Sequence, residues 1–351
     1  RSFSAINAPS MPKRLKILAL FDAVRPTTLD QDLSAELQTV DWKTEAAVLA
    51  ALRELGHPHA TLALFDDMDL LRQKLQSFQP DVIFNLADQF RNDRALDQHI
   101  AAYLAMHDLP FTGCGPTALA LCKNKAIAKR LVASHGIRTA RFVTIPRGRR
   151  LLAPPPLAFP LIVKPLREEA SYGISGAAFV KTLAQYRARV RYLEERTGDD
   201  ILVEEYIDGR ELYVSLIGHR HPQVCPIREL VFGNLPPGAP RIATYQAKWD
   251  LAYRRRRGVA SRFVTDLAPA VVRRIATASR TIYRALEIDG YARLDLRLTP
   301  DNEITFIEAN PNPMLSPDED FAQSAMRTGL TYPQLIDRLA RMGMRRPAVP
   351  G

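Results

Sequence analysis

Two carboxylates and one amide lie in neighbouring segments of the last third of the chain. Asp295 belongs to "YARLDLRL", and Glu308 and Asn310 belong to "FIEANPNPMLSP". Their oxygens are hard ligands of the kind that Mg²⁺ takes from proteins, with water and phosphate oxygens completing its shell. An aspartate and a glutamate at one end of a hairpin are more commonly solvated residues, so a metal site here requires a phosphate-binding partner elsewhere.

That partner is suggested by the segment "FPLIVKPLREEASYGISG". An apolar strand delivers Lys164, and a loop containing Ser171, Gly173, Ser175 and Gly176 follows. A lysine can meet a phosphate as a point charge, and the N–H groups of a small-residue loop can hold the remaining oxygens. A lysine snorkelling from an edge strand before a surface turn is the alternative reading of the same segment.

Further candidates for nucleotide contacts occur on both sides of this loop. Lys125 lies early in a helix after "LCKN", where an exposed helix position is the alternative. The segment "ILVEEYIDGREL" adds Glu204 and Glu205 at the end of an apolar strand and Glu211 at the start of the next. Such a segment can hold adenine through backbone edges and ribose through a carboxylate, although acidic strand ends are common.

The elements that position these residues follow from the hydrophobic periodicity. In the first part, strands and helices are expected in turn over 16–21, 44–55, 61–65, 70–78, 81–86 and 96–106. Strands separated by helices of this length predict a small parallel sheet. The pattern changes after Pro110, which places a domain boundary near Phe111.

The rest of the chain begins with two glycines and a proline, which open a helical stretch that ends at Gly136. Strands are then expected over 142–145, 161–165, 201–206, 211–217, 291–298 and 304–309, and helices over 183–196 and 269–286 and after Asp318 and Tyr332. A third part starts close to Asp199. The predicted domains therefore cover 11–110, 111–198 and 199–351, and Arg1 to Ser10 are expected to lie outside the fold.

The turn "TPDN" predicts a hairpin between the two strands that carry the carboxylates. Alternation along the first strand puts Arg293, Asp295 and Arg297 on one face. In the expected register Asp295 and Glu308 point to the same side, with Asn310 just beyond.

Taken in order, these segments resemble the ATP-grasp superfamily and, within it, the D-alanine–D-alanine ligase-like group. The resemblance runs from about Phe111 to Ser316 and is carried by "FTGCGPTALALCKNK", "FPLIVKP", "ILVEEYIDGRE", "ATYQAKWD", "GYARLDLRL" and "FIEANPNP". It implies an α/β fold in which a small parallel-sheet N-terminal domain precedes two α+β ATP-grasp subdomains, central and C-terminal, that clamp ATP.

The resemblance also implies roles for individual residues. Lys125 and Lys164 match the lysines that contact the nucleotide phosphates, Glu211 matches the ribose carboxylate, and the adenine-holding hinge corresponds to Glu204, Glu205, Tyr206 and Ile207. The magnesium ligands, with Mn²⁺ as a possible replacement ion, correspond to Asp295, Glu308 and Asn310. The catalytic candidates are Arg293, which faces the transferred phosphate and acyl group, Lys248 of the mobile-loop motif "YQAKWD", and Ser171.

The reaction that the resemblance implies is ATP-dependent ligation of a carboxylate to an amine through an acylphosphate, with release of ADP and phosphate. The expected substrates are amino acids. Arg293 and backbone N–H groups of the "NPNPML" loop are candidates for holding the oxyanion. A homodimer joined through the N-terminal domain is a further implication.

The sequence departs from D-alanine–D-alanine ligases where they recognise their first substrate. Their glycine-rich turn ending in a glutamate has no match in "LFDAVRPTTLDQDLSAE", and "NLADQFRND" replaces their histidine-glycine segment. Ala170, Trp249 and Met314 stand where those ligases carry serine, tyrosine and glycine. A different acid, a different amine, or both are therefore expected.

Composition narrows the other classes of function. The chain has 351 residues, 46% of them hydrophobic, three cysteines without a CxxC pair, and no apolar run long enough for a membrane helix. These features predict a cytoplasmic protein without a membrane partner. The net charge of +10 is dispersed, and no nucleic-acid-binding motif surrounds its two arginine clusters, so nucleic acid is not expected as a partner.

Two further hypotheses follow from the sequence. The altered N-terminal segments leave a non-catalytic ATP-binding regulator as the alternative function. The run "RRRR" at 254–257 follows the mobile-loop motif, and it is expected to lie mostly in a solvated loop with Arg256 or Arg257 reaching the closed site.

Overall fold

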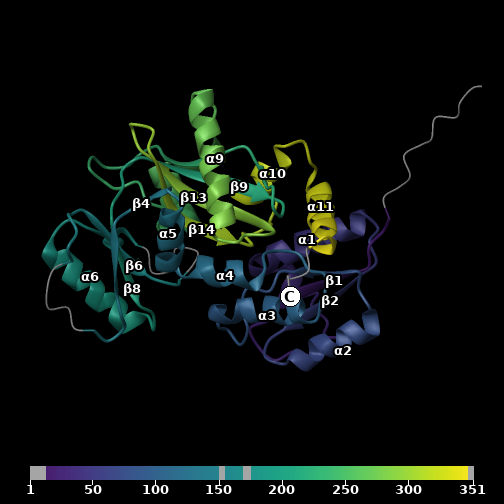
Figure 1. The fold of residues 1–351 in the computed structure, drawn as a ribbon. Helices are drawn as coiled ribbons and strands as arrows, with labels where there is room; N and C mark the ends of the chain where they lie inside the picture. Colours follow the sequence, from purple (N-terminus) through teal and green to yellow (C-terminus); the bar gives the residue numbers. More distant parts are fainter. Residues whose placement is uncertain (1–12, 150–154, 169–174, 347–351) are drawn as a thin grey trace, which may run out of the picture.

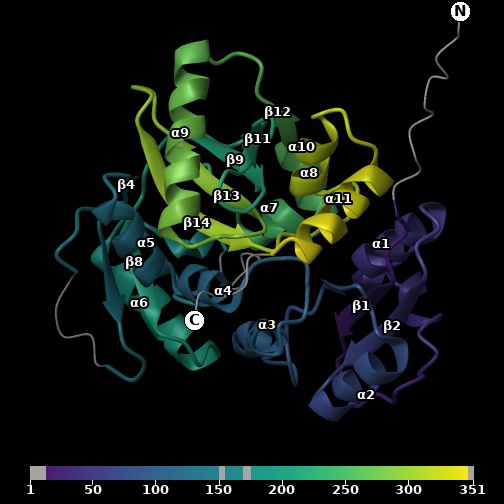
Figure 2. The ribbon, with the colours of Figure 1, turned by 45° about the vertical axis from the view of Figure 1, so that its right-hand side comes forward.

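The computed structural model describes residues 13–149, 155–168 and 175–346. Within these residues there are three sheets, of three, seven and four strands. In Figures 1 and 2 the N-terminal part around β1 and β2 and the part around β6 and β8 lie on opposite sides, below the largest sheet. No helix in the described ranges has the length and apolar character needed to cross a membrane.

The N-terminal sheet is parallel, in the order β2–β1–β3, as the alternating pattern predicted. Its strands and helices are β1 (Ile17–Asp22), α1 (Lys43–Glu54), β2 (His59–Leu64), α2 (Met68–Phe78), β3 (Val82–Asn85) and α3 (Asp97–Met106). The central strand β1 is buried on both faces, which explains its unbroken apolar run. The C-terminal helix α11 (Tyr332–Met344) returns to pack beside α1 in the core of this part.

The four-stranded sheet has the order β5–β8–β6–β7, and all its pairs are antiparallel. Its elements are β5 (Phe142–Ile145), β6 (Leu161–Pro165), β7 (Phe179–Val180), α6 (Leu183–Arg196) and β8 (Ile201–Glu205). Tyr186, Val190 and Leu193 of α6 pack onto its apolar face. The domain boundaries stay a prediction, and the pairing of β8 within this sheet favours a boundary later than Asp199.

The seven-stranded sheet has the order β12–β11–β9–β13–β14–β4, with β10 paired to β9. Its strands are β4 (Arg138–Thr139), β9 (Arg210–Ile217), β10 (Gln223–Val224), β11 (Arg228–Phe232), β12 (Val259–Phe263), β13 (Tyr291–Leu298) and β14 (Ile304–Pro311). The accompanying helices are α4 (Pro116–Lys123), α5 (Lys125–Ser134), α7 (Tyr245–Trp249), α8 (Leu251–Arg257), α9 (Pro269–Ala285) and α10 (Asp320–Met326).

Successive side chains of β13 point to opposite faces of the seven-stranded sheet, and the two faces differ in polarity. Leu294 and Leu296 of β13 pack with Ile282 of α9 in a common core. The intervening residues of β13, among them Asp295, lie on the opposite face. One face of the sheet is therefore covered by apolar side chains of the helices, and the other face carries the charged side chains.

A β-bulge sets the register of the β13–β14 hairpin. Leu296 pairs with Phe306 and Asp295 pairs with Glu308, so Ile307 is an extra residue in β14. If β14 kept regular pairing past Phe306, Asp295 would lie opposite Ile307, and Glu308 would face the apolar side of the sheet. The bulge thus gives Glu308 the side that the sequence predicted for it.

The helical stretch expected up to Gly136 is two helices rather than one. Asn124 adopts an extended backbone between α4 and α5, and its side chain accepts a hydrogen bond from the Ile127 N–H. It is therefore the N-cap of α5. This cap places Lys125 in the first turn of a new helix.

Candidate active site

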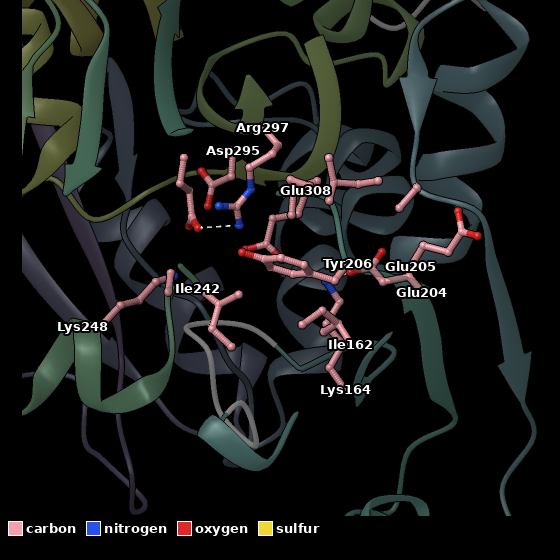
Figure 3. A pocket seen from close by; sticks show the side chains of 15 residues that line it. Ile162, Lys164, Glu204, Glu205, Tyr206, Ile242, Lys248, Asp295, Arg297 and Glu308 are labelled. Atoms are coloured by element: carbon pink, nitrogen blue, oxygen red, sulfur yellow. Dashed lines mark hydrogen bonds and ion pairs between the residues drawn. The ribbon is translucent and has the colours of Figure 1, made fainter. Parts of the chain in front are cut away.

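A pocket lies between the four-stranded and seven-stranded sheets. Its lining residues are Ala140, Ile162, Lys164, Glu204, Glu205, Tyr206, Ile207, Glu211, Ile242, Ala243, Lys248, Asp295, Arg297, Ile307 and Glu308. Figure 3 shows Asp295, Arg297 and Glu308 on one side of it, facing Ile162, Lys164, Glu204, Glu205 and Tyr206, with Ile242 and Lys248 on a third side. Residues of the predicted phosphate, hinge and metal segments therefore meet in one place.

Asp295 and Arg293 form a buried ion pair beside this pocket. Arg293 donates from Nε to Asp295 Oδ1 at 2.8 Å and from Nη2 to Oδ2 at 3.0 Å. The guanidinium carbon also lies 4.7 Å from the ring centre of Tyr213, within cation–π range. Arg293 is not among the residues that line the pocket, and it is held on two sides, by Asp295 and by Tyr213.

The predicted cations of the site act electrostatically on the Glu308 carboxyl. Burial alone would raise the pKa of its carboxyl. Opposing influences are larger and lower that pKa, and they come from Lys125, Lys164, Lys248 and Arg293. Asp295 behaves differently, because burial, its largest influence, raises its pKa despite the opposing Arg293, and Glu308 raises it further. One carboxylate of the predicted metal pair is thus firmly ionised, and the other is stabilised mainly by its arginine.

The donor set of the predicted metal site fits a hard cation. Asp295 and Glu308 are cross-strand partners, and Asn310 is the partner of Arg293 on the same hairpin. The buried Nδ2 of Asn310 has no hydrogen-bond partner within the described residues, so a half-turn of the amide is free to present its oxygen. In that part of the chain no group of three or more His, Cys, Asp or Glu is placed to hold a metal.

Lys164 and Glu204 are paired at the wall of the pocket. Their Nζ and Oε1 atoms lie 2.6 Å apart, and the second oxygen of Glu204 lies 2.9 Å from Lys129 Nζ. Burial opposes the charge of Glu204, but the two lysines outweigh it and lower its pKa to about 2. The carboxylate of Glu204 therefore faces lysines at the pocket wall, a contact that the predicted adenine hinge did not anticipate.

Lys125 is buried but is not among the residues that line the pocket. Its Nζ donates to the carbonyl of Glu168 at 2.5 Å and to that of Leu166 at 3.5 Å, both after strand β6. It still acts on Glu308 through space, as the lowered pKa of that carboxyl shows. Ser171, the third catalytic candidate, lies outside the described residues.

The segment after β8 supplies a mixed polar and apolar wall. Glu205 accepts from Arg141 Nε at 2.9 Å, and the Tyr206 hydroxyl donates to Asp208 at 3.1 Å. The Tyr206 ring lies edge-on to Phe179, with 4.9 Å between ring centres. Ile207 also lines the pocket. A flat apolar group bounded by backbone polar groups fits such a wall.

Glu211 forms a buried pair with a residue to which the sequence assigned no role. Arg297 Nη2 lies 3.0 Å from Glu211 Oε2, and Arg297 also donates to the carbonyls of Gly209 and Arg241. Both Glu211 and Arg297 line the pocket. The signal was present in the alternation that put Arg297 on the face of Asp295.

Lys248 lies in the short helix α7, and the arginine run that follows forms helix α8 rather than the expected loop. Arg255 and Arg256 are exposed. Arg257 lines a second cavity that shares Ile242 with the first pocket. Of the two arginines expected to reach the site, Arg257 is therefore the nearer to it.

The loop after Asn310 is fastened to the start of the central part. Asn312 has a left-handed backbone with φ 54°, and its Oδ1 accepts from the Cys114 N–H at 2.6 Å. A Cβ on the neighbouring Gly113, whose φ is +92°, would lie 2.7 Å from that oxygen. Glycine is thus required for this close approach. Met314, which follows in the loop, is 42% exposed.

The two segments that depart from the ligase pattern meet at the carboxyl end of the N-terminal sheet. Asp22 accepts hydrogen bonds from the N–H of Asp88 at 3.0 Å and from Gln89 Nε2 at 2.6 Å. Burial, followed by the charge of Asp88, raises the pKa of Asp22 to about 7. Burial also raises the pKa of Glu45, in α1, to about 7.

Comparisons with known proteins agree with the resemblance. The family model described as "D-ala D-ala ligase C-terminus" matches residues 131–341. The uncharacterized protein y4sG of Sinorhizobium fredii is 33% identical over 307 residues, which cover 86% of this chain and 87% of that protein. The D-alanine–D-alanine ligase of Gluconobacter oxydans is 28% identical over 305 residues, covering 86% of this chain and 93% of that ligase.

Solved structures show the same fold. D-alanine–D-alanine ligase from Bacillus anthracis complexed with ATP has a TM-score of 0.71 at 19% identity, covering 94% of this chain and 98% of that chain. VanG D-Ala:D-Ser ligase from Enterococcus faecalis has a TM-score of 0.68 at 19% identity, covering 94% and 100%. These likenesses confirm the fold class predicted from the sequence.

Proposed function

Because this chain belongs to the family of D-alanine–D-alanine ligase-like ATP-grasp proteins, we propose that it is an ATP-dependent ligase that joins a carboxylate to an amine. One observation carries the proposal. Candidate phosphate, ribose and metal residues from both sheets and from α7 line a single pocket. The reaction proceeds through an acylphosphate and releases ADP and phosphate.

ATP binds in the pocket between the two sheets. The wall from Glu204 to Ile207 takes the adenine, and Glu211 takes the ribose. Lys164 and Lys125 neutralise charge on the phosphates. The excess of cations around Glu308 supports this assignment, since a tetra-anionic ligand needs compensation in a site shielded from water.

Magnesium, or manganese in its place, is the metal that this donor set fits. Asp295, Glu308 and Asn310 would hold it, with phosphate oxygens and water filling its shell. When bound, it supplies charge neutralisation for the β- and γ-phosphates.

The substrate carboxylate takes the γ-phosphoryl group, because a carboxylate oxygen leaves only after it has been activated. The amine then attacks the acyl carbon, and phosphate departs. Arg293, oriented by Asp295 and Tyr213, and the N–H groups of the loop after Asn310 hold the negative oxygen that develops. Lys248 on α7 closes the pocket and keeps water from the acylphosphate.

Amino acids are the proposed substrates, since the named relatives are D-alanine–D-alanine and D-Ala:D-Ser ligases. The acid, the amine or both differ from D-alanine, because Asp22, Asp88 and Gln89 replace the segments with which those ligases recognise their first substrate. Met314 restricts the backbone where they carry glycine. We also propose that the protein is cytoplasmic and that it forms a homodimer joined through the N-terminal domain.

The second candidate function is an ATP-binding regulator without catalysis. The altered N-terminal segments favour it, and the presence of Asp295, Glu308 and Asn310 argues against it. Nucleic-acid binding rests on net charge alone and has the weakest support.

The test is a screen of amino-acid pairs for ADP release that requires both an acid and an amine, with product masses read by mass spectrometry. A ligase gives ADP and a product whose mass equals the two substrates less water. ATP binding without turnover on any pair would replace the ligase with the regulator.

A further inference from the structure

A chain of three buried charges connects the nucleotide pocket to helix α5. Glu204 contacts Lys164 through Oε1 at 2.6 Å and Lys129 through Oε2 at 2.9 Å. The exposed fractions are 3% for Lys164, 4% for Glu204 and 0% for Lys129. Lys164 and Glu204 line the pocket, whereas Lys129 lies behind them, and its Nζ also donates to the Phe306 carbonyl at 3.4 Å.

We propose that Lys129 is a positioning residue for nucleotide binding. It holds one oxygen of Glu204, so that Lys164 keeps both its position and a positive charge that a phosphate can meet. The inference rests on the proposed function, because it needs an anionic nucleotide in this pocket.

Charge balance explains why the third residue matters. An isolated pair of Lys164 and Glu204 is neutral and attracts a phosphate weakly. Lys129 adds a second positive charge, so the three residues carry one positive charge in excess. Burial strengthens the field of that charge, since little water lies between it and the pocket. Glu308 also acts on Lys164, which increases the need for a compensating cation.

Geometry supports the same role. The two oxygens of the Glu204 carboxylate lie 2.6 Å and 2.9 Å from lysine Nζ atoms, so an ion pair on either side limits its orientation and that of Lys164, although Oε2 accepts no hydrogen bond within the described residues. Burial lowers the pKa of Lys129, whereas the pKa of Lys164 is raised chiefly by Glu204 against its own burial. Burying the charged Lys129 ammonium is therefore unfavourable, and Lys129 does not reach the pocket. The negative charge of Glu204 offsets this desolvation penalty.

The experiment measures the dissociation constant for Mg-ATP by calorimetry, with no acid or amine present. Lys129→Met should raise that constant about tenfold, because Glu204 then neutralises Lys164. Lys129→Arg should restore part of the affinity. The double variant Lys129→Met/Glu204→Gln should bind Mg-ATP more tightly than Lys129→Met alone, since Lys164 regains its free charge.

Lys123→Met is the matched control. Lys123 is also a buried lysine, 7% exposed, and its Nζ lies 2.7 Å from Asp97 Oδ1 outside the pocket. Its replacement should lower the melting temperature and leave the dissociation constant unchanged. A purely structural Lys129 would behave in the same way. If Lys129→Met fails to fold, the double variant, in which both buried charges are removed, and Lys129→Arg give the comparison.

Three results would overturn the inference: wild-type affinity in Lys129→Met, a double variant that binds Mg-ATP no better than Lys129→Met, or absence of Mg-ATP binding by the unmodified protein. If the unmodified protein binds Mg-ATP and the variants show the expected affinities, but no amine-dependent ADP release is found, the ligase proposal is removed and the role of Lys129 stands.

Discussion

The buried carboxylates of the nucleotide pocket and the partly buried carboxylates of the N-terminal part have different neighbours. In the pocket, Glu204 lies between two lysines and its pKa falls to about 2. At the end of β1, Asp22 has Asp88 and an amide as neighbours, and its pKa rises to about 7. Both carboxyls lose water on folding, but a cation compensates only the first.

The difference follows the resemblance to the ligases. Where the sequence matches their motifs, the buried carboxylates are paired with cations. Where it departs, at Asp22 and Asp88, a carboxylate is held beside another and takes up a proton readily. In the pocket, lysines offset the burial of a carboxylate. In the N-terminal region, Asp22 lies beside Asp88 without such a cation, and its negative charge destabilises the fold; strongly shifted pKa values of this kind are common at functional sites.

The most severe way to break this comparison is to neutralise the carboxylates of the pocket. Asp295→Asn and Glu308→Gln should each lower kcat/KM by about a thousandfold or more, because the proposed metal would lose a carboxylate ligand and the phosphates would lose the positive charge that the metal supplies. The measurement is amine-dependent ADP release on the pair found by the screen. Near-normal rates in either variant would remove the metal assignment.

Removing a cation from the pocket should damage stability. Arg297→Met leaves Glu211 buried without its 3.0 Å partner, and it should lower the free energy of unfolding in urea by about 3 kcal/mol. Arg297→Met/Glu211→Gln should recover part of that loss. If the single variant were as stable as the parent, the pocket would not depend on compensation.

Removing an anion from the N-terminal region should do the opposite. Asp22→Asn should raise the free energy of unfolding at pH 8 by about 1–2 kcal/mol, since Gln89 can turn its amide to keep the hydrogen bond. The exposed Asp301→Asn is the control for losing one negative charge, and it should change little.

The pH dependence of this effect has a definite sign. The pKa of Asp22 is raised from 3.8 to about 7 on folding, so its stabilising contribution is complete below pH 4 and is lost as the pH rises to 7. Asp22→Asn should therefore flatten the fall in stability over that range. An unchanged slope would contradict the raised pKa.

The smallest effect is expected at the arginine run. Arg257→Ala should raise the KM for ATP or for the acid about threefold, because Arg257 lines the cavity next to the pocket. The exposed Arg256→Ala should leave both constants unchanged. Equal constants in both variants and the parent would exclude the run from the site.

Local patterns in the sequence predicted much of the fold. The strand expected over 291–298 is β13 with those bounds, and the parallel N-terminal sheet follows from its alternating strands and helices. Strands β11 and β12 were not predicted: β12 is the edge strand of its sheet, β11 lies between β12 and β9, and the pairing of both depends on partners elsewhere in the chain. The return of α11 to the N-terminal core is equally non-local.

The same distinction between local and non-local information applies to the site. The residues that line the pocket were largely identifiable from motifs, whereas Lys129 and Arg297 required knowledge of their partners. Lys129 reads in sequence as an ordinary helix lysine, and only the packing of α5 against the sheets reveals that its Nζ meets Glu204. Partners of buried charges lie far apart in the chain, so spacing alone does not indicate them.

The extra residue Ile307 in β14 has an evolutionary consequence. The bulge absorbs this residue and leaves Glu308 opposite Asp295, whereas one more residue inserted beside it would turn Glu308 and Asn310 into the apolar layer while leaving their identities unchanged. A substitution in this hairpin changes one side chain at a time. Such an insertion moves several side chains at once, and relatives of this protein should therefore vary in the residue types of this hairpin far more freely than by added residues.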